Sequence, residues 1–202
     1  MKKSGLFSLV LVAAAAIIAA VLMTFGLQGS GTSGKLTADI GGPFKLMSSN
    51  GAVIDSTTLK GKPYAVYFGF THCPEVCPTT MAEMTEAYEK LGDAAKDFTT
   101  FFVTVDPERD TVEFLHDYLL TFDKRFVGLV PTMEELPVIA KNFRAVYEKV
   151  PTSDGSYTMN HTASVYLFDG DGKLTATLGY GEPEKARMAK LRKLLGVASP
   201  AS

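Results

Sequence analysis

An apolar strand that turns directly into a helix is the feature that most restricts the possible folds of this chain. Residues 65–70 (AVYFGF) are an apolar run of strand-forming side chains, which fits a strand buried on both faces. Proline is favoured in the first turn of a helix and excluded from its interior, so we expect a helix that begins at Pro78 and ends at Gly92. Cys73 and Cys77 lie between the strand and this helix.

The same order of elements is repeated further along the chain. Residues 100–105 (TFFVTV) predict a second buried strand, and residues 112–120 (VEFLHDYLL) predict a second helix with Thr111 as its N-cap. Residues 126–130 fit a short third strand. The sequence therefore predicts a run of alternating strands and helices.

The last third of the chain predicts a hairpin and a terminal helix. Thr132 and Glu135 have the spacing of a capping box, which opens a helix to about Phe143. The tetrapeptide DGDG at 169–172 is a strong hairpin signal. The other expected elements are an extended stretch at 145–150, hairpin strands at 162–168 and 173–178, and a helix from Pro183.

This order of elements predicts an α/β fold with a mixed sheet and helices on both faces. The thioredoxin-like fold fits it. At 202 residues, 46% of them hydrophobic, the chain has enough apolar residues for one globular domain with a full core. We find no internal repeat.

The first 27 residues predict an N-terminal transmembrane helix. Lys2 and Lys3 precede an uncharged stretch at 6–27, which is long enough to span a bilayer and longer than a typical signal-peptide core. The alternative is a cleaved signal, with small residues in the 13–20 region as the cleavage site. The positive-inside rule places both lysines in the cytoplasm and the rest of the chain on the outer side, periplasmic or equivalent.

The remaining chain divides into three parts. Residues 28–41 begin with a Gly/Ser-rich segment and predict a flexible linker. Residues 42–196 form the expected thioredoxin-like domain, and 197–202 are a tail. Outside the first 27 residues, 18 Lys and Arg stand against 22 Asp and Glu, a formal charge of −4. This balance argues against binding to nucleic acid.

The two cysteines are the candidates for chemistry. In an oxidising compartment Cys73 and Cys77 can form a disulfide with each other or hold a metal, and a disulfide that closes so short a loop gains little stability. With Pro78 as the first helical residue, Cys77 is the expected N-cap, and the helix dipole should lower the pKa of its thiol. A small structural disulfide is the alternative interpretation.

Two thiolates need a further partner to hold a metal, and soft sulfur ligands select Cu(I). His116 fits the solvated face of the second predicted helix. His72 adjoins Cys73, but its ring is expected to point away from the cysteine pair. His161 follows a loop of about ten residues and opens the strand at 162–168, so the residues alone leave its role open between a ligand and a surface position.

Three other features have both structural and functional interpretations. Residues 105–111 (VDPERDT) follow the second strand. In the structural interpretation, Asp110 and Thr111 cap a helix and Arg109 pairs in water with Glu108 or Asp106. In the functional interpretation, the segment is a charged rim that receives a partner. Met81 and Met84 fit the core face of the first helix. Met159 shares a face with His161 if the segment is extended, and would then be a weak extra ligand.

Three motifs, FGFTHCPEVCPTTM, VDPERDT and NHTASVYLFDGDGKL, resemble the SCO/SenC family of copper-binding, thioredoxin-fold proteins. The resemblance covers about residues 42–196. It implies that one copper ion, Cu(I) or Cu(II), is bound by Cys73, Cys77 and His161. It also implies an N-terminal anchor and, as partner, the copper-site subunit of cytochrome c oxidase; the copper donor stays open.

The function implied by this resemblance is that of a copper chaperone that helps assemble the oxidase copper centre by metal transfer. The alternative is an enzyme: Cys73 and Cys77 as a catalytic redox pair that reduces the cysteines of the oxidase copper site, or that acts like a peroxiredoxin. Zinc catalysis is a third option, because two cysteines, one histidine and water form a known zinc site. The motif shows no obvious general base for it.

Overall fold

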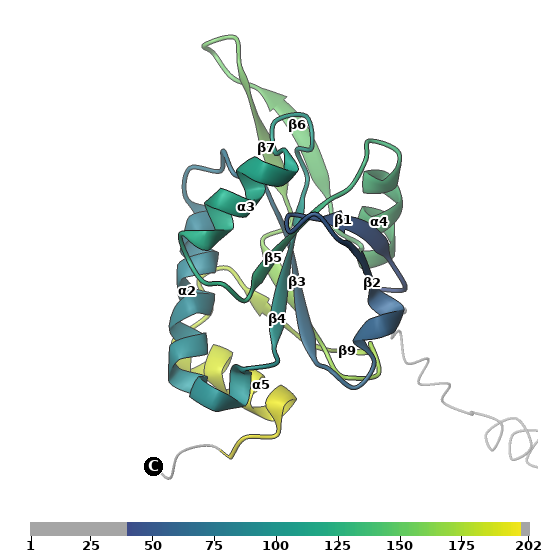
Figure 1. Cartoon of the computed structure of the whole chain (residues 1–202). Helices are drawn as coiled ribbons and strands as arrows, with labels where there is room; N and C mark the ends of the chain where they lie inside the picture. Colours follow the sequence, from purple (N-terminus) through teal and green to yellow (C-terminus); the bar gives the residue numbers. More distant parts are fainter. Residues whose placement is uncertain (1–39, 199–202) are drawn as a thin grey trace, which may run out of the picture. The chain divides into compact units, whose positions relative to one another are not determined.

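The computed structural model describes residues 40–198 (Figure 1). Its main sheet has seven strands in the order β2-β1-β5-β4-β3-β8-β9, and a separate two-stranded sheet pairs β6 with β7. The strands are β1 (Lys45–Ser48), β2 (Val53–Asp55), β3 (Tyr64–Gly69), β4 (Thr99–Thr104), β5 (Phe126–Val130), β6 (Tyr147–Pro151), β7 (Tyr157–His161), β8 (Ser164–Phe168) and β9 (Leu174–Gly179).

Three parallel strands form the centre of the main sheet. β3 pairs in parallel with β4, and β4 pairs in parallel with β5, while the flanking strands β8, β9, β1 and β2 are antiparallel to their neighbours. Every residue of β3 is buried, as its unbroken apolar run predicted. The loops after β3 and β4 leave the same edge of the sheet, where sites in α/β proteins gather.

The helices begin and end close to where the sequence predicted. The Thr111 hydroxyl accepts a hydrogen bond from Phe114 N (3.1 Å), and Thr132 and Glu135 exchange the two reciprocal bonds of a capping box (2.8 and 3.2 Å). Gly92 ends its helix with a positive φ of 53°. The helices are α2 (Val76–Leu91), α3 (Val112–Leu120), α4 (Glu135–Phe143) and α5 (Glu184–Leu195), with 3-10 turns η1 (Ser56–Leu59) and η2 (Gly92–Ala95).

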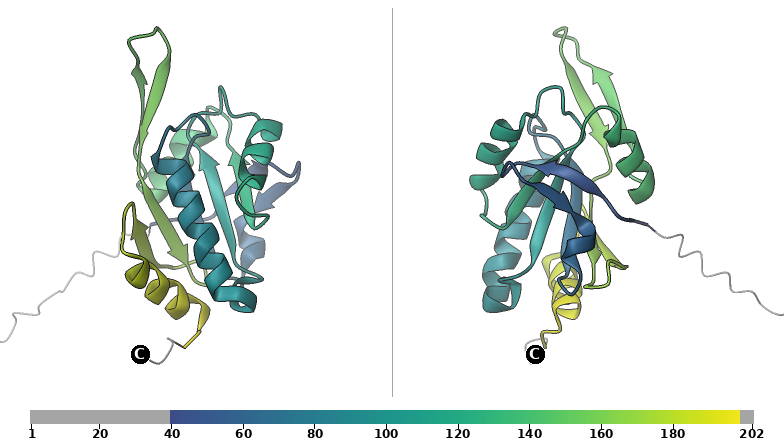
Figure 2. Two further views of the ribbon diagram at one scale, coloured as in Figure 1. Left: turned by 90° about the vertical axis from the view of Figure 1, so that its left-hand side faces the viewer. Right: turned by 45° about the vertical axis from the view of Figure 1, so that its right-hand side comes forward.

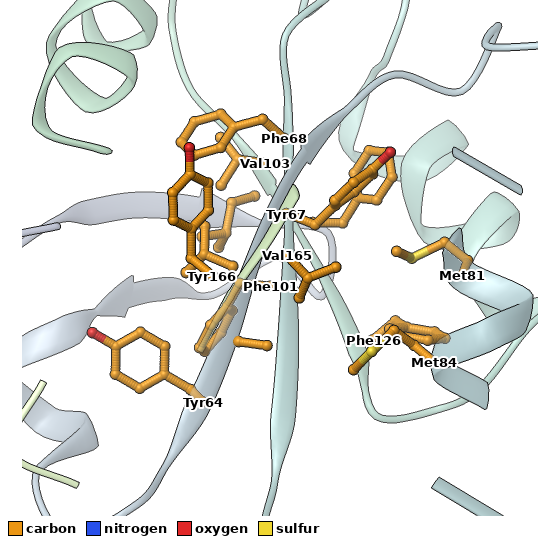
Figure 3. Packing of buried hydrophobic residues seen from close by; sticks show 14 of the residues in the cluster. Tyr64, Tyr67, Phe68, Met81, Met84, Phe101, Val103, Phe126, Val165 and Tyr166 are labelled. Carbon is orange, nitrogen blue, oxygen red and sulfur yellow. The ribbon is translucent and has the colours of Figure 1, made fainter. Parts of the chain in front are cut away.

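Alternate residues of β3 face opposite layers of helices (Figure 3). Tyr67 lies across from Phe102, with ring centroids 5.7 Å apart, and Phe102 packs against Tyr118 of α3. Phe68 points to the other face, where it packs against Phe143 of α4 at 5.5 Å. The thioredoxin-like mixed sheet covered on both faces is therefore confirmed.

Two parts of the fold were not predicted. The antiparallel pair of β1 and β2 extends one edge of the main sheet. The segment before His161 is not a loop of about ten residues: residues 157–160 belong to strand β7. The predicted extended stretch at 145–150 forms most of β6, and the two strands make a hairpin in which Tyr147 pairs with His161 and Pro151 with Tyr157. Figure 2 shows this hairpin extending beyond the end of the main sheet.

The predicted membrane helix at 1–27 lies outside the described residues, as do most of the predicted linker and residues 199–202 of the tail. Among the residues that are described, no helix combines the length and hydrophobicity needed to cross a bilayer. Gly41, which was assigned to the linker, donates its N–H to the carbonyl of Asn142 (2.9 Å). Gly41 is therefore in contact with the domain.

Candidate metal centre

The loop between β3 and α2 places both cysteines at the carboxyl edge of the sheet. A turn folds this loop, because Cys73 N donates to the Phe70 carbonyl at 3.3 Å. The helix begins two residues earlier than predicted, at Val76 with Glu75 as N-cap, so Cys77 lies inside the first turn. Pro78 is tolerated there because the first four N–H groups of a helix have no intrahelical acceptor.

Cys73, rather than Cys77, therefore lies where the helix N-terminus stabilises negative charge. The backbone N–H of Cys77 donates to Cys73 Sγ at 3.4 Å. Cys73 retains 9% of its surface exposed, whereas Cys77 is fully buried. Both thiols are free. The two sulfurs thus differ in access: one faces the surface and the other is enclosed.

The predicted drop in the pKa of Cys77 is wrong: the thiol with the lowered pKa is that of Cys73. A hydrogen bond from the Cys77 thiol is the largest cause that lowers the pKa of Cys73 to about 3; His161 and the backbone N–H groups of Cys77 and Glu75 contribute, against the opposing effect of burial. The pKa of Cys77 is raised, because its proton is held by Cys73, its thiol is buried and a second anion would lie beside the first.

His161 completes a cluster with the two sulfurs. It is the last residue of β7, and its Nε2 lies 3.4 Å from Cys77 Sγ. Its Nδ1 lies 3.2 Å from the carbonyl oxygen of Thr162, which can only accept, so Nδ1 donates there and Nε2 is the ring nitrogen that faces the sulfurs. The residues alone left the role of His161 open, and only the family resemblance implied that it is a ligand.

The ligating atoms of Cys73, Cys77 and His161 all lie within 4.8 Å of one another. Donor atoms that each lie about 2.3 Å from one shared metal ion can be no more than about 4.6 Å apart. The cluster therefore needs only a small adjustment to hold a single ion. Two sulfurs and one imidazole nitrogen suit copper, and also zinc.

Two residues of β3 enclose the buried sulfur of this cluster. The Tyr67 hydroxyl donates to Cys77 Sγ at 3.6 Å, and a Cβ at Gly69 would lie 2.9 Å from the same sulfur. Glycine at position 69 is what allows the backbone to approach Cys77 so closely. Neither residue was predicted to belong to the site, because both lie within a run that fits a buried strand.

The other two histidines lie elsewhere. His72 packs its ring near Phe114 and places Nδ1 3.0 Å from the Thr71 hydroxyl, so it points away from the sulfurs as expected. His116 lies on α3, outside the cluster. Met81 and Met84 are core residues, as predicted. Met159 is buried and shares a face of β7 with His161, so its role as a weak extra ligand stays a prediction.

The 105–111 segment is more deeply buried than its charges suggested. Arg109 does pair with Asp106, as the structural interpretation held, but Asp106 is only 3% exposed and the pair does not lie in open water. Asp110 is fully buried, and accepts hydrogen bonds from the backbone N–H and hydroxyl of Thr71 and from the Thr104 hydroxyl. These bonds attach the segment to the loop that carries the cysteines.

Comparisons with known proteins place this geometry in one family. A family model described as SCO1/SenC matches residues 32–196. An SCO2-like protein of Rickettsia felis is 38% identical over 136 residues, which is 66% of either chain and just under two thirds of that protein's length. An SCO2-like protein of Rickettsia conorii is 36% identical over 155 residues, 76% of either chain.

Solved structures agree with this match. The copper-bound structure of Bradyrhizobium japonicum ScoI is 40% identical, with a TM-score of 0.70, over 77% of this chain and 99% of that one. The copper-bound structure of Arabidopsis thaliana ScoI is 32% identical, with a TM-score of 0.72, over 78% of this chain and 98% of that one. With the family model and the curated relatives in agreement, the chain belongs to the SCO1/SenC family.

Proposed function

We propose that this protein is a copper chaperone that binds one copper ion through Cys73, Cys77 and His161. The observation that carries the proposal is the convergence of two sulfurs and one imidazole nitrogen within 4.8 Å. Thiolates select Cu(I), and imidazole binds copper in either oxidation state. Two solved relatives more than 30% identical to this chain are described with copper bound, which supports copper over zinc.

The two thiols have different roles in binding and releasing the ion. Cys77 is enclosed by Tyr67 and by the close approach of Gly69, so its sulfur is the protected ligand. Cys73 is the more exposed of the two thiols, so we expect an acceptor thiolate to bond to the copper on that side as the bond to Cys73 breaks. The proposed acceptor is the copper-site subunit of cytochrome c oxidase, as the sequence resemblance implied.

A metal titration of the full chain tests the copper proposal. The reduced protein is expected to bind one Cu(I), or one Cu(II) with a sulfur-to-copper charge-transfer band, whereas the disulfide form should bind neither here. Both thiolates are needed as ligands, and a disulfide consumes them. Equal copper uptake by the reduced and oxidised proteins contradicts the proposal, as does preferential retention of zinc in direct competition.

A second function, thiol-disulfide exchange, is favoured by the unequal thiols. The lowered pKa keeps Cys73 a thiolate at neutral pH, and Cys77 lies beside it with its proton. Cys73 would attack a partner disulfide and displace one partner sulfur as a thiolate; Cys77 would then give up its proton, attack Cys73 Sγ and displace the second partner sulfur. The two partner thiolates take up one proton from Cys77 and one from water. The partner disulfide is reduced and this dithiol is oxidised. His161 is not needed as a ligand in that reaction.

The proposed chaperone is anchored by residues 6–27, with its domain on the outer side of the membrane. The uncharged length of this segment, preceded by Lys2 and Lys3, supports the proposal. The intact mass of protein extracted from membranes is expected to include the whole segment. A soluble species that begins between about residues 26 and 32 would instead establish a cleaved signal.

A further inference from the structure

We infer that Arg109 and Tyr157 are positioning residues of the metal centre: they fasten the β6–β7 hairpin to the loop after β4 and so fix where His161 meets the two cysteines. The inference rests on the proposed copper function. It also gives the 105–111 segment a role that neither helix capping nor a docking rim supplies.

The hairpin that carries His161 needs an external support. Its two strands form a sheet of their own, with no ladder to the seven-stranded sheet. An isolated two-stranded hairpin is marginally stable at best in water. Cys73 and Cys77 are held by β3 and α2, whereas the third member of the cluster is delivered by this projecting element (Figure 1). The position of the imidazole thus depends on what holds the hairpin in place.

Tyr157 is the first residue of β7, and several of its groups contact the loop after β4. The Arg109 guanidinium carbon lies 3.7 Å from the centroid of the Tyr157 ring, and Arg109 Nη1 donates to the Tyr157 carbonyl at 3.1 Å. The Tyr157 hydroxyl donates to Asp106 Oδ1 at 2.9 Å, and Arg109 Nε donates to Oδ2 of the same carboxylate. Tyr157 is therefore bound through its ring, its hydroxyl and its backbone.

The same arginine also reaches the packing around His161. Residues i, i+2 and i+4 of a strand share one face, so Tyr157 and His161 project from the same side of β7. The Arg109 guanidinium carbon lies 6.0 Å from the centroid of the Phe70 ring, and Phe70 packs edge-to-face against His161 at 5.7 Å. Arg109 thus contacts the hairpin at Tyr157 and a ring that flanks the imidazole.

Arginine is specifically suited to this role. Its planar guanidinium can stack on an aromatic ring and donate several hydrogen bonds in the same plane, while the rounder ammonium of lysine cannot reproduce that combination. Arg109→Lys keeps the charge but should lose the stack and at least one of the two donated bonds. The structure also provides a matched control: Arg125 stacks 4.1 Å from the Tyr88 ring centroid and pairs with Asp123, among residues that are not part of the metal cluster.

The test compares Arg109→Lys with Arg125→Lys in the full chain loaded with Cu(II). Removing groups that orient a metal ligand typically costs 10- to 100-fold in metal affinity, and a loss of about that size is expected for Arg109→Lys alone. Its electron paramagnetic resonance spectrum should show a weaker or broadened histidine-nitrogen hyperfine pattern. The rate of Cys73–Cys77 disulfide formation should stay within about twofold of wild type, because the thiols keep their supports.

Substitutions of the tyrosine separate positioning from general stability. Tyr157→Phe keeps the stacked ring and the backbone bond and should retain most of the affinity, whereas Tyr157→Leu should lose as much as Arg109→Lys. The inference is overturned if Arg109→Lys and Arg125→Lys bind copper equally well, or if Arg109→Lys binds weakly with an unchanged nitrogen pattern. Failure of the wild-type protein to bind copper would instead refute the proposed function on which the inference rests.

Discussion

His161→Ala is expected to weaken copper binding by at least about 100-fold while leaving the two cysteines able to form a disulfide. Loss of a group that only orients a ligand costs up to about 100-fold, and this change removes the ligand itself. The Cys77 N–H that stabilises Cys73 comes from the helix and is retained. Competition with a Cu(I) chelator measures the affinity, and titration with a small disulfide measures the thiol chemistry.

The matched control for this variant is His72→Ala. His72 adjoins Cys73 in the sequence, but its ring bonds to Thr71 and packs near Phe114, so copper affinity should change little. In cells at limiting copper, with both proteins at equal membrane levels, only His161→Ala should fail to support oxidase assembly. Normal oxidase activity with His161→Ala would contradict the chaperone proposal and favour thiol-disulfide exchange, which does not require this ligand.

The central part of the fold was predictable because its signals are local. An unbroken apolar run gave β3, Thr111 and the Thr132–Glu135 pair marked two helix starts, and DGDG marked the β8–β9 hairpin. Each signal arises from hydrogen bonds or burial within a few residues of the chain. The β1–β2 pair lacked such a signal, because β2 is three residues long with none of them fully buried.

The site was less predictable from residue patterns, because it depends on pairings between distant parts of the chain. Cys77 and His161 are 84 positions apart in the sequence and come together only through the fold, and family resemblance, not spacing, pointed to the histidine. The pKa error has a local origin. A start of α2 at Val76 instead of Pro78 moves Cys77 into the helix and gives the stabilised position to Cys73.

Polar residues made the second strand of the β6–β7 hairpin hard to predict. The extended stretch predicted at 145–150 forms most of β6, but the polar residues before His161, Thr158 and Asn160 among them, suggested a loop in place of β7. The pairing is supported from outside, by the stack of Arg109 on Tyr157, and side chains 48 residues apart give no local sequence signal. The 105–111 segment was recognised as important, but its partner could be found only in three dimensions.

The alkylation rate of Cys73 in the reduced, metal-free protein is expected to be nearly independent of pH between roughly pH 5 and 8. The thiolate is the reactive form, and a pKa of about 3 makes Cys73 almost fully thiolate throughout this range, with loss only as the pH falls toward that value. An ordinary cysteine, with a pKa of about 8.5, should react about tenfold faster with each added pH unit over the same range. Iodoacetamide labelling followed by intact mass measures the rate.

Substitutions at Cys77 show which contact keeps Cys73 ionised. The thiol of Cys77 is the leading cause of the low pKa, so Cys77→Ala should raise the pKa of Cys73 and restore a slope at the acidic end of the profile. Cys77→Ser retains an O–H donor at the same position and should keep the profile flat. These variants also ensure that label is read from Cys73 alone. A wild-type rate that climbs tenfold per pH unit would show that Cys73 is an ordinary thiol, and would remove the basis for assigning it the first role in disulfide exchange.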